Sequence, residues 1–467
     1  MAIVYKTFQC GHCYYVYDRN FNTIIRITKE EYDVLSLPDN DSKKIALIQK
    51  YQNYGYLDES KLKHIENPFL HFLEPFEQRH CSQPILQVTQ DCNLRCEYCF
   101  YVNESYLGRR YSEKNMDFET AKKAIDFFLK NSIANDNVTV SFYGGEPLLR
   151  MDLIKQCVEY IRNNLQNRTA SYSLTTNGTL LTLDKAKFFW ENNFDIMISL
   201  DGAKENHDKH RVFPNGKGSF DVIIRNLAAL KEHYPDFFKH IHFNCVISPD
   251  TDHKVIREYV ENSSLLKDSG FMSSLIQDNY TTDSIVYDDK LIVDTSYGVF
   301  KVLLYMLGRL QFDDISGFFK PHIVFYDKLK SLLKDHTQIP ERAHHGGPCV
   351  AGAKRLFVDI NGRFFPCEKV SESSDKMNIG NIDKGIFLDK VAELINYGKV
   401  FEVQCLNCWA FNHCKICPAE VDDLNGFSAE LQLRRCQRVK NSLLSDMKDI
   451  CTVNHLKKIE RHQGGLQ

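Results

Sequence analysis

The sequence contains no long hydrophobic run, no excess of basic charge and little low-complexity sequence. No apolar stretch approaches the roughly 18 to 20 residues of a membrane-spanning helix. The 58 Lys and Arg residues nearly balance the 61 Asp and Glu residues, and no basic face stands out. The first residues also lack the basic-then-apolar order of a signal peptide. We therefore expect a cytoplasmic location, with neither nucleic acid nor a membrane as partner.

Cysteine, in contrast, is frequent, with 16 in 467 residues. Disulfides do not persist in a reducing compartment, so this number of cysteines indicates metal binding or redox chemistry. A chain of this length predicts roughly two to four domains with real hydrophobic cores.

Three of the cysteines stand close together, directly after an apolar run at 84–88 that predicts a strand. Cys92, Cys96 and Cys99 have the spacing C-x3-C-x2-C. A loop this tight can bring three thiolates onto one face of a metal cluster, but it offers no fourth sulfur. A four-iron cluster held by three cysteines keeps one iron open for chemistry. A zinc knuckle, or a chance grouping of buried cysteines, would show the same spacing, so the context has to decide.

Residues 1–80 predict a small separate domain. Segment 14–27 has β-prone runs on either side of turn-forming Asp and Asn, which is typical of a hairpin. Thr28 followed by Glu31 matches a capping box that opens a helix, and a second helix is expected from Asp41 or Ser42. A strand pair with small helices suits a winged-helix-like module. The pair Cys10 and Cys13 lies just ahead of the hairpin and is weak evidence for a metal.

Residues 84–300 alternate between β-rich runs and amphipathic segments. After the run at 84–88, strands are predicted at 138–142, 171–175, 195–200, 242–247 and 271–276, and helices include 118–129 and 220–230. Repeated βα units imply parallel strands with right-handed crossovers. The sequence therefore predicts an α/β fold built on an incomplete six-stranded βα barrel.

The ends of these strands carry polar or glycine-rich sequence. The cysteine triad follows the first strand, 144–147 (Gly-Gly-Glu-Pro) the second, 176–178 the third and 201–202 the fourth. In βα barrels the site gathers at the carboxyl ends of the strands. We expect these four segments to converge.

The order of these four strand-end segments resembles that in the radical S-adenosylmethionine (radical SAM) enzymes, and the resemblance covers residues 84–246. The resemblance implies a 4Fe–4S cluster on Cys92, Cys96 and Cys99 whose open iron binds S-adenosylmethionine. The implied contacts to that cofactor are Tyr98 near the adenine, Gly144, Gly145 and Glu146 around the amino group, Asn177 at the ribose, and Ser199 and Arg211 at the carboxylate. An electron from a donor such as a flavodoxin or ferredoxin would then release a 5′-deoxyadenosyl radical, which removes a hydrogen atom from an unactivated carbon.

Beyond the barrel we expect a helical connector at 301–345, a cysteine-rich domain at 346–450 and a tail at 451–467. The cysteine-rich domain resembles the SPASM extension of radical SAM enzymes that modify peptides and proteins. That family carries two auxiliary iron–sulfur clusters, of the 4Fe–4S type. The resemblance assigns Cys405, Cys408, Cys414 and Cys436 to one cluster and Cys349, Cys367 and Cys417 to the other.

This domain departs from the family pattern twice. Two residues separate Cys414 from Cys417 where three are common, and no cysteine lies between Cys349 and Cys367. The cluster of Cys349, Cys367 and Cys417 would thus have three protein thiolates. A zinc ribbon on Cys405, Cys408, Cys414 and Cys417 is the alternative that spacing allows.

The N-terminal module resembles the leader-recognition domains of peptide-natural-product maturases, and 357–362 and 365–368 resemble maturases of cysteine-rich peptides. The hypothesis is therefore oxidative thioether formation in a precursor peptide that is bound through its leader. Alternatives are a sulfatase-type maturase that forms formylglycine, carbon–carbon crosslinking of a peptide, and a non-catalytic electron-transfer or peptide-carrier protein.

Overall fold

Six parallel strands form the centre of the largest sheet in the computed structural model, which describes residues 3–267, 269–334, 336, 338–346 and 349–464. Each strand lies beside the one that precedes it in the chain, and every pair is parallel. The strands are β5 (Pro84–Thr89), β6 (Asn137–Gly144), β7 (Thr169–Thr176), β8 (Phe194–Ser199), β9 (Ile241–Ile247) and β10 (Gly270–Leu275). This arrangement confirms the predicted α/β fold with an incomplete βα barrel.

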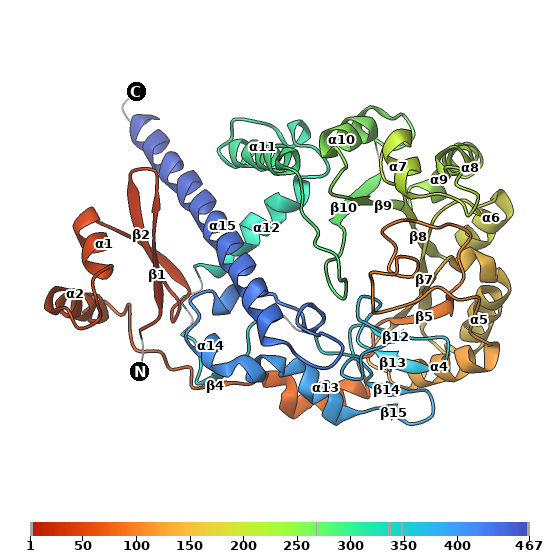
Figure 1. Ribbon diagram of the computed structural model, residues 1–467, viewed down its shortest axis with the longest axis horizontal. Coiled ribbons are helices and arrows are strands. Elements are labelled where there is room, and N and C mark those ends of the chain that lie inside the picture. The colour runs from red at the N-terminus through yellow and green to blue at the C-terminus, as the bar shows by residue number, and fades with distance from the viewer. Residues whose placement is uncertain (1–2, 268, 335, 337, 347–348, 465–467) are drawn as a thin grey trace.

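Helices connect these strands and lie along the outer side of the curved sheet (Figure 1). In α4 (Phe118–Lys130), the Asp117 side chain accepts a hydrogen bond from the Thr120 N–H, and buried residues recur at helical spacing. The others are α5 (Met151–Asn164), α6 (Leu183–Glu191), α7 (Lys204–His210), α8 (Phe220–His233), α9 (Pro235–Phe238) and α10 (His253–Asn262), with the 3-10 turn η2 (Pro147–Arg150) before α5. The predicted helices at 118–129 and 220–230 are confirmed.

Short strands from the C-terminal part extend the same sheet beyond β5, which the sequence did not predict. β12 (Leu356–Val358) pairs in parallel with β5, and its three side chains are fully buried. That burial holds so short a strand in place. β13 (Arg363–Phe365), β14 (Gly380–Asn381) and β15 (Gly385–Ile386) continue the sheet as antiparallel pairs. The C-terminal cysteine region is therefore attached to the strand that leads into the cysteine triad.

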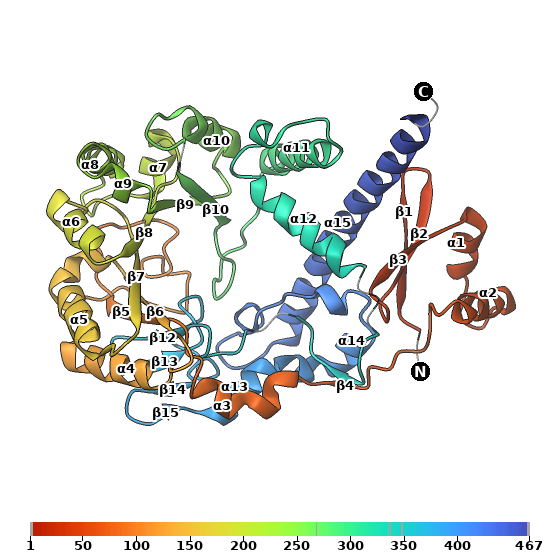
Figure 2. The same ribbon diagram turned by 180° about the vertical axis from the view of Figure 1, so that it is seen from behind.

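A separate three-stranded antiparallel sheet forms the N-terminal part (Figure 2). It consists of β1 (Tyr5–Cys10), β2 (Cys13–Asp18) and β3 (Thr23–Ile27), so the predicted hairpin is confirmed and β1 is added to it. α1 (Lys29–Leu35) begins with the predicted capping box of Thr28 and Glu31, and Asp41 caps α2 (Ser42–Asn53). We call β1–β3, α1 and α2 the N-terminal module.

Two predicted domain boundaries are wrong because continuous helices run through them. The boundary at 300/301 falls inside α11 (Asp289–Met306), and the boundary at 450/451 falls inside α15 (Ala429–Gly464). Residues 451–464 are therefore helix and not a tail, and residues 465–467 lie outside the described residues. The remaining elements are β4 (His64–Ile65), η1 (Pro68–Phe72), α3 (Leu73–Glu77), η3 (Phe312–Asp314), α12 (Lys320–Leu332), β11 (Arg342–Ala343), α13 (Leu388–Ile395), η4 (Tyr397–Phe401), α14 (Glu402–Leu406), η5 (Phe411–His413) and η6 (Pro418–Glu420).

The helices also bear on membrane insertion. Over the part of the chain that the structure describes, none is both long enough and apolar enough to cross a membrane.

Candidate active site

The loop after β5 brings the three predicted cysteine ligands together at the open end of the parallel strands. Burial, followed by the charge of Glu146 and by the neighbouring thiols, raises the pKa of Cys92 to about 12. Burial likewise raises the pKa of Cys96 to about 12 and raises the pKa of Cys99. Such thiols stay protonated at neutral pH, so a metal cluster has to displace their protons when it binds. Three soft sulfur donors on one loop fit an iron–sulfur cluster with one open iron.

Gly144 and Gly145 lie where the end of β6 approaches the residues just before the triad. A Cβ atom on Gly144 would lie closer than 3.0 Å to the Thr89 carbonyl oxygen, and one on Gly145 equally close to the Asp91 carbonyl oxygen. The Gly145 N–H donates to the Thr89 oxygen (3.0 Å). The glycines are therefore required for the close approach of two backbone segments. The Cβ side of each glycine is filled by the backbone of 89–91.

Glu146, which the resemblance places near the amino group of S-adenosylmethionine, is fully buried and joins strand ends. One oxygen accepts from the Thr176 hydroxyl (2.7 Å) and from a backbone N–H in η2, and the other accepts from the Asn177 N–H (2.8 Å). These donors satisfy a carboxylate that has lost its water. The Asn177 side chain then reaches the Asn93 side-chain oxygen (2.9 Å) and the Cys92 sulfur (3.9 Å). Glu146 therefore fixes Asn177 beside the triad.

Arg211, Asp201 and Tyr98 form a buried cluster at the end of β8. The Nε and Nη2 of Arg211 donate to the two carboxylate oxygens of Asp201 (2.8 and 3.3 Å), and the Tyr98 hydroxyl donates to the same carboxylate. Burial favours the neutral acid, but Arg211 outweighs it and lowers the pKa of Asp201. Ser199 ends β8 opposite Asn244. The Arg211 fork, expected at a ligand carboxylate, is thus already bound to Asp201, a partner that the sequence analysis did not identify.

The charges that act on the seven C-terminal cysteines divide them into two groups that do not follow their order in the chain. One contains Cys405, Cys408, Cys414 and Cys436, and the other contains Cys349, Cys367 and Cys417. Burial, followed by the other members of its group, raises the pKa of Cys405 to about 12. Burial and then nearby acidic groups, Cys417 and Cys349 among them, raise the pKa of Cys367 to about 12. A zinc ribbon would instead need Cys417 beside Cys405.

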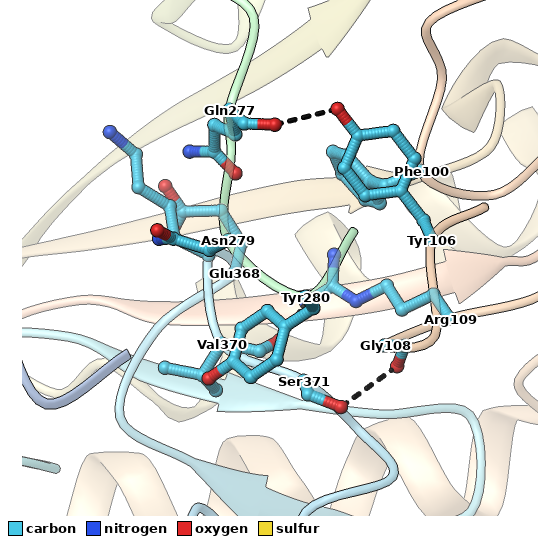
Figure 3. A pocket seen from close by; sticks show the side chains of 11 residues that line it. Phe100, Tyr106, Gly108, Arg109, Gln277, Asn279, Tyr280, Glu368, Val370 and Ser371 are labelled. Atoms are coloured by element: carbon cyan, nitrogen blue, oxygen red, sulfur yellow. Dashed lines mark hydrogen bonds between the residues drawn. The ribbon is translucent and has the colours of Figure 1, made fainter. Parts of the chain in front are cut away.

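A pocket is lined by residues that follow the triad in the chain and by residues that follow Cys367 (Figure 3). Phe100, which follows Cys99, lines one side, and Glu368, which follows Cys367, lines another. The other lining residues come from the loops after the triad, after β10 and after Cys367; they are Tyr106, Gly108, Arg109, Gln277, Asn279, Tyr280, Lys369, Val370 and Ser371. The cavity has a volume of about 20 Å³, which is room for a water molecule, so a larger molecule would bind against this wall from outside the cavity. A molecule bound here would contact residues adjacent to both cysteine groups.

Two pocket residues were missed by the sequence analysis. Arg109 is buried, and neither its Nε nor its Nη1 has a hydrogen-bond partner among the described residues. The Tyr280 hydroxyl donates to Asp422 (3.0 Å), which lies just after Cys417. Both residues stand in irregular loops outside any motif, so no spacing or periodicity marks them.

Comparison with known proteins agrees with this geometry. Residues 86–260 match the family model of the Radical SAM superfamily. A cysteine-type anaerobic sulfatase-maturating enzyme from Clostridium novyi is 28% identical over 349 residues, which cover 72% of this chain and 86% of that protein. The radical SAM cyclopropyl synthase TigE from Paramaledivibacter caminithermalis is 23% identical over 433 residues, 84% of this chain and 83% of that protein.

The fold is also found among solved structures. The structure described as native anSMEcpe with bound AdoMet has a TM-score of 0.57 and 21% identity, and covers 80% of this chain and 99% of its own. Radical SAM enzymes use S-adenosylmethionine and a 4Fe–4S cluster. The chain carries a radical SAM domain and is homologous to the anaerobic sulfatase-maturating enzymes and to TigE.

Proposed function

We propose that this chain forms thioether crosslinks in a ribosomally made, cysteine-rich precursor peptide. The support is the pocket of Figure 3, which is lined both by the neighbour of Cys99 and by the neighbour of Cys367. A 4Fe–4S cluster on the triad, with S-adenosylmethionine bound, would supply a 5′-deoxyadenosyl radical that removes a hydrogen atom from an unactivated carbon. A peptide bound against the outer wall of this pocket would offer that carbon on the triad side and a cysteine sulfur on the Cys367 side.

Thioether formation breaks one C–H bond and one S–H bond and makes one C–S bond. The hydrogen atom of the carbon goes to the 5′-deoxyadenosyl radical, and the thiol proton leaves to solvent. One electron is left over, so the reaction needs an acceptor. Each of the two C-terminal cysteine groups could bind an iron–sulfur cluster, and such a cluster can accept this electron. Because the group of Cys349, Cys367 and Cys417 has three thiols, it leaves room for a substrate sulfur.

A basic groove beside the N-terminal module favours a peptide substrate. The groove has a volume of about 470 Å³ and lies between β3, the C-terminal end of α12 and α15. Among the described residues that line it no carboxylate occurs, and the basic ones are Arg26, Lys330, Lys334, His336, His455 and Lys458. In a chain with a net charge of −3, this is a local concentration of positive charge. It complements an acidic, extended peptide.

β3 is an edge strand of the N-terminal sheet and forms one wall of this groove. Cys10 and Cys13 face each other across a two-residue turn, so alternate residues of β2 bond to β1 and the others to β3. By this register, the backbone groups of Ile24 and Arg26 point away from β2. An extended peptide can add there as a further strand. We infer that the leader of the precursor binds along β3.

The test uses enzyme reconstituted anaerobically with iron and sulfide, S-adenosylmethionine, dithionite, and a short cysteine-rich peptide with an acidic leader. We expect 5′-deoxyadenosine and a peptide that has lost two hydrogen atoms per link, with linked sulfurs that resist alkylation. Free cysteines that remain intact after turnover would contradict the proposal. Replacing Lys334 and Lys458 by Glu should weaken peptide binding about tenfold at low salt, and cleavage of S-adenosylmethionine without peptide should not change.

The extent of the homology favours formylglycine formation as a second candidate. The Clostridium novyi relative, a sulfatase-maturating enzyme, shares most of its length with this chain. Formylglycine formation from cysteine exchanges the sulfur for oxygen, whereas thioether formation retains the sulfur in a link. A synthetic peptide that carries a sulfatase motif, offered beside the cysteine-rich peptide, distinguishes the two by mass. A carbon–carbon crosslink would also remove two hydrogen atoms, but it would leave every cysteine open to alkylation.

A further inference from the structure

A buried ion pair joins the loop after the cysteine triad to the loop after Cys367. The Nε of Arg109 lies 2.7 Å from the Oε1 of Glu372, and the two side chains are only 3% and 7% exposed. Arg109 also donates through Nη2 to the Val370 carbonyl oxygen (3.2 Å), and the Glu372 N–H donates to the Gly108 carbonyl oxygen (3.1 Å). Side-chain and backbone contacts together hold the two loops in one register along the wall of the pocket in Figure 3.

Gln87 connects this ion pair to both sides of the triad. Its Nε2 donates to the Oε1 of Glu372 (2.7 Å) and to the Tyr101 hydroxyl (2.8 Å), and its Oε1 accepts from the Ile360 N–H (3.1 Å). Gln87 lies on β5 just before the triad, and Tyr101 lies just after Cys99. One buried network therefore contacts the chain before the triad, after the triad and on the Cys367 side of the pocket.

A gain in the free energy of unfolding does not by itself explain why this ion pair is buried. Both charges lose their hydration, and replacing a buried ion pair by apolar residues of similar size is often neutral for the free energy of unfolding. The hydrogen bonds that flank the pair, from Arg109 Nη2 to the Val370 oxygen and from Gln87 Nε2 to Glu372, involve charged groups and fix a direction and a distance, which apolar packing does less strictly. The guanidinium is also held over the rings of Phe100 and Phe357, at 5.1 and 4.8 Å.

We propose that Arg109 and Glu372 are positioning residues, which set the loop of Cys92, Cys96 and Cys99 against the loop of Cys367. This placement lets one bound peptide reach both cysteine groups. The inference rests on the proposed function, because it places the peptide against the outer wall of this pocket.

The test compares variants of the full-length, reconstituted enzyme. Arg109→Met combined with Glu372→Met removes both charges and the directional contact, and it leaves no buried charge without a partner, so the protein should fold. Arg109→Lys keeps the charge and rescues part of the contact. Arg257→Met with Asp294→Leu is the matched control. This pair lies between α10 and α11, with Nη2 and Oδ1 2.7 Å apart and side chains 16% and 12% exposed.

The readout is the amount of modified peptide formed per 5′-deoxyadenosine. In the double methionine variant we expect this ratio to fall about 10- to 100-fold, because misplacement of about 1 Å has effects of that size. Arg109→Lys should recover part of the ratio. The control variant should lower the melting temperature and leave the ratio unchanged. An unchanged ratio in the double methionine variant, or an equal fall in the control, would overturn the proposal.

Failure of the proposed function would be visible separately, in the unmodified enzyme. If that enzyme gives a product other than a thioether, the ratio is taken for that product and the positioning test stands. If it gives no product, hydrogen exchange decides. The double methionine variant should then exchange faster at 100–109 and at 368–372 together, and unchanged exchange in either segment would overturn the positioning role.

Discussion

The cysteine triad and the C-terminal cysteines gather sulfur side chains in different ways. The triad is contiguous, because Cys92, Cys96 and Cys99 share one loop after one strand, and their spacing alone brings them together. The C-terminal groups are interleaved, because Cys417 lies with Cys349 and Cys367 whereas Cys414 lies with the other group. A contiguous group needs only its loop in place. An interleaved group needs a whole region folded around it.

The largest expected effect separates the two kinds of group. Replacing Cys92, Cys96 and Cys99 together by Ala should abolish 5′-deoxyadenosine formation and remove about four iron ions per chain, since no other described cysteine joins this group. The C-terminal groups should keep their iron. Iron analysis and a 5′-deoxyadenosine assay check this. The matched control replaces Cys349, Cys367 and Cys417, and should lose similar iron but still cleave S-adenosylmethionine. Loss of all iron in the triad variant would show that the regions are not independent.

The interleaving itself can be tested by pairs of substitutions. Cys417→Ala should remove about four iron ions per chain, and adding Cys349→Ala should remove no more, because both thiols belong to one group. Adding Cys414→Ala to Cys417→Ala should remove about twice as many, although these two cysteines are neighbours in sequence. Iron and sulfide content give the answer. Additive losses for Cys349 and Cys417 would contradict the grouping.

A smaller effect is expected where the triad loop meets the end of β6. Gly145→Ala should lower the free energy of unfolding by about 1–3 kcal/mol, because its Cβ atom would meet the Asp91 carbonyl oxygen. Gly317→Ala is the matched control, since nothing lies within 4 Å of its Cβ position. That variant should differ from the parent by less than about 0.5 kcal/mol. Denaturant unfolding measures both, and equal effects would mean that the backbone at Gly145 has room to relax.

A pH-dependent effect of comparable size concerns a buried acid in α3. Glu77 is 3% exposed, its oxygens have no hydrogen-bond partner among the described residues, and Oε2 lies 2.7 Å from the Cβ position of Gly352. Burial raises the pKa of Glu77 from 4.5 to about 8. The folded state therefore favours the protonated acid, and stability is lost as the pH rises from about 4.5 through about 8.

Glu77→Gln should remove this loss. Relative to the parent, the variant should gain roughly 1 kcal/mol of stability for each pH unit across that range. Unfolding measured at several pH values checks the slope. Parallel pH profiles for the parent and the variant would contradict the buried, protonated state of Glu77.

The sequence predicted features that depend on local order. Alternating strands and helices, the capping box of Thr28 and Glu31, and the triad after β5 follow from short-range spacing. Contacts between distant segments could not be predicted in the same way. Glu372 follows the barrel in the chain, yet it pairs with Arg109, which lies near the start of the barrel. β12 joins the sheet with only three residues, and Asp201 forms an ion pair with the guanidinium of Arg211. Each depends on the three-dimensional path of the chain, which no spacing records.

The length of helix α15 sets the distance between the basic groove and the C-terminal cysteines. The helix carries Cys436 near its start and lines the basic groove from Ile450 onward. A helix rises about 1.5 Å per residue, so the roughly 14 residues between these points span about 21 Å. An extended peptide covers at most about 3.3–3.6 Å per residue. A substrate that docks beside β3 and reaches the cysteine groups therefore needs a spacer of at least about six residues, and shorter spacers should bind without being modified.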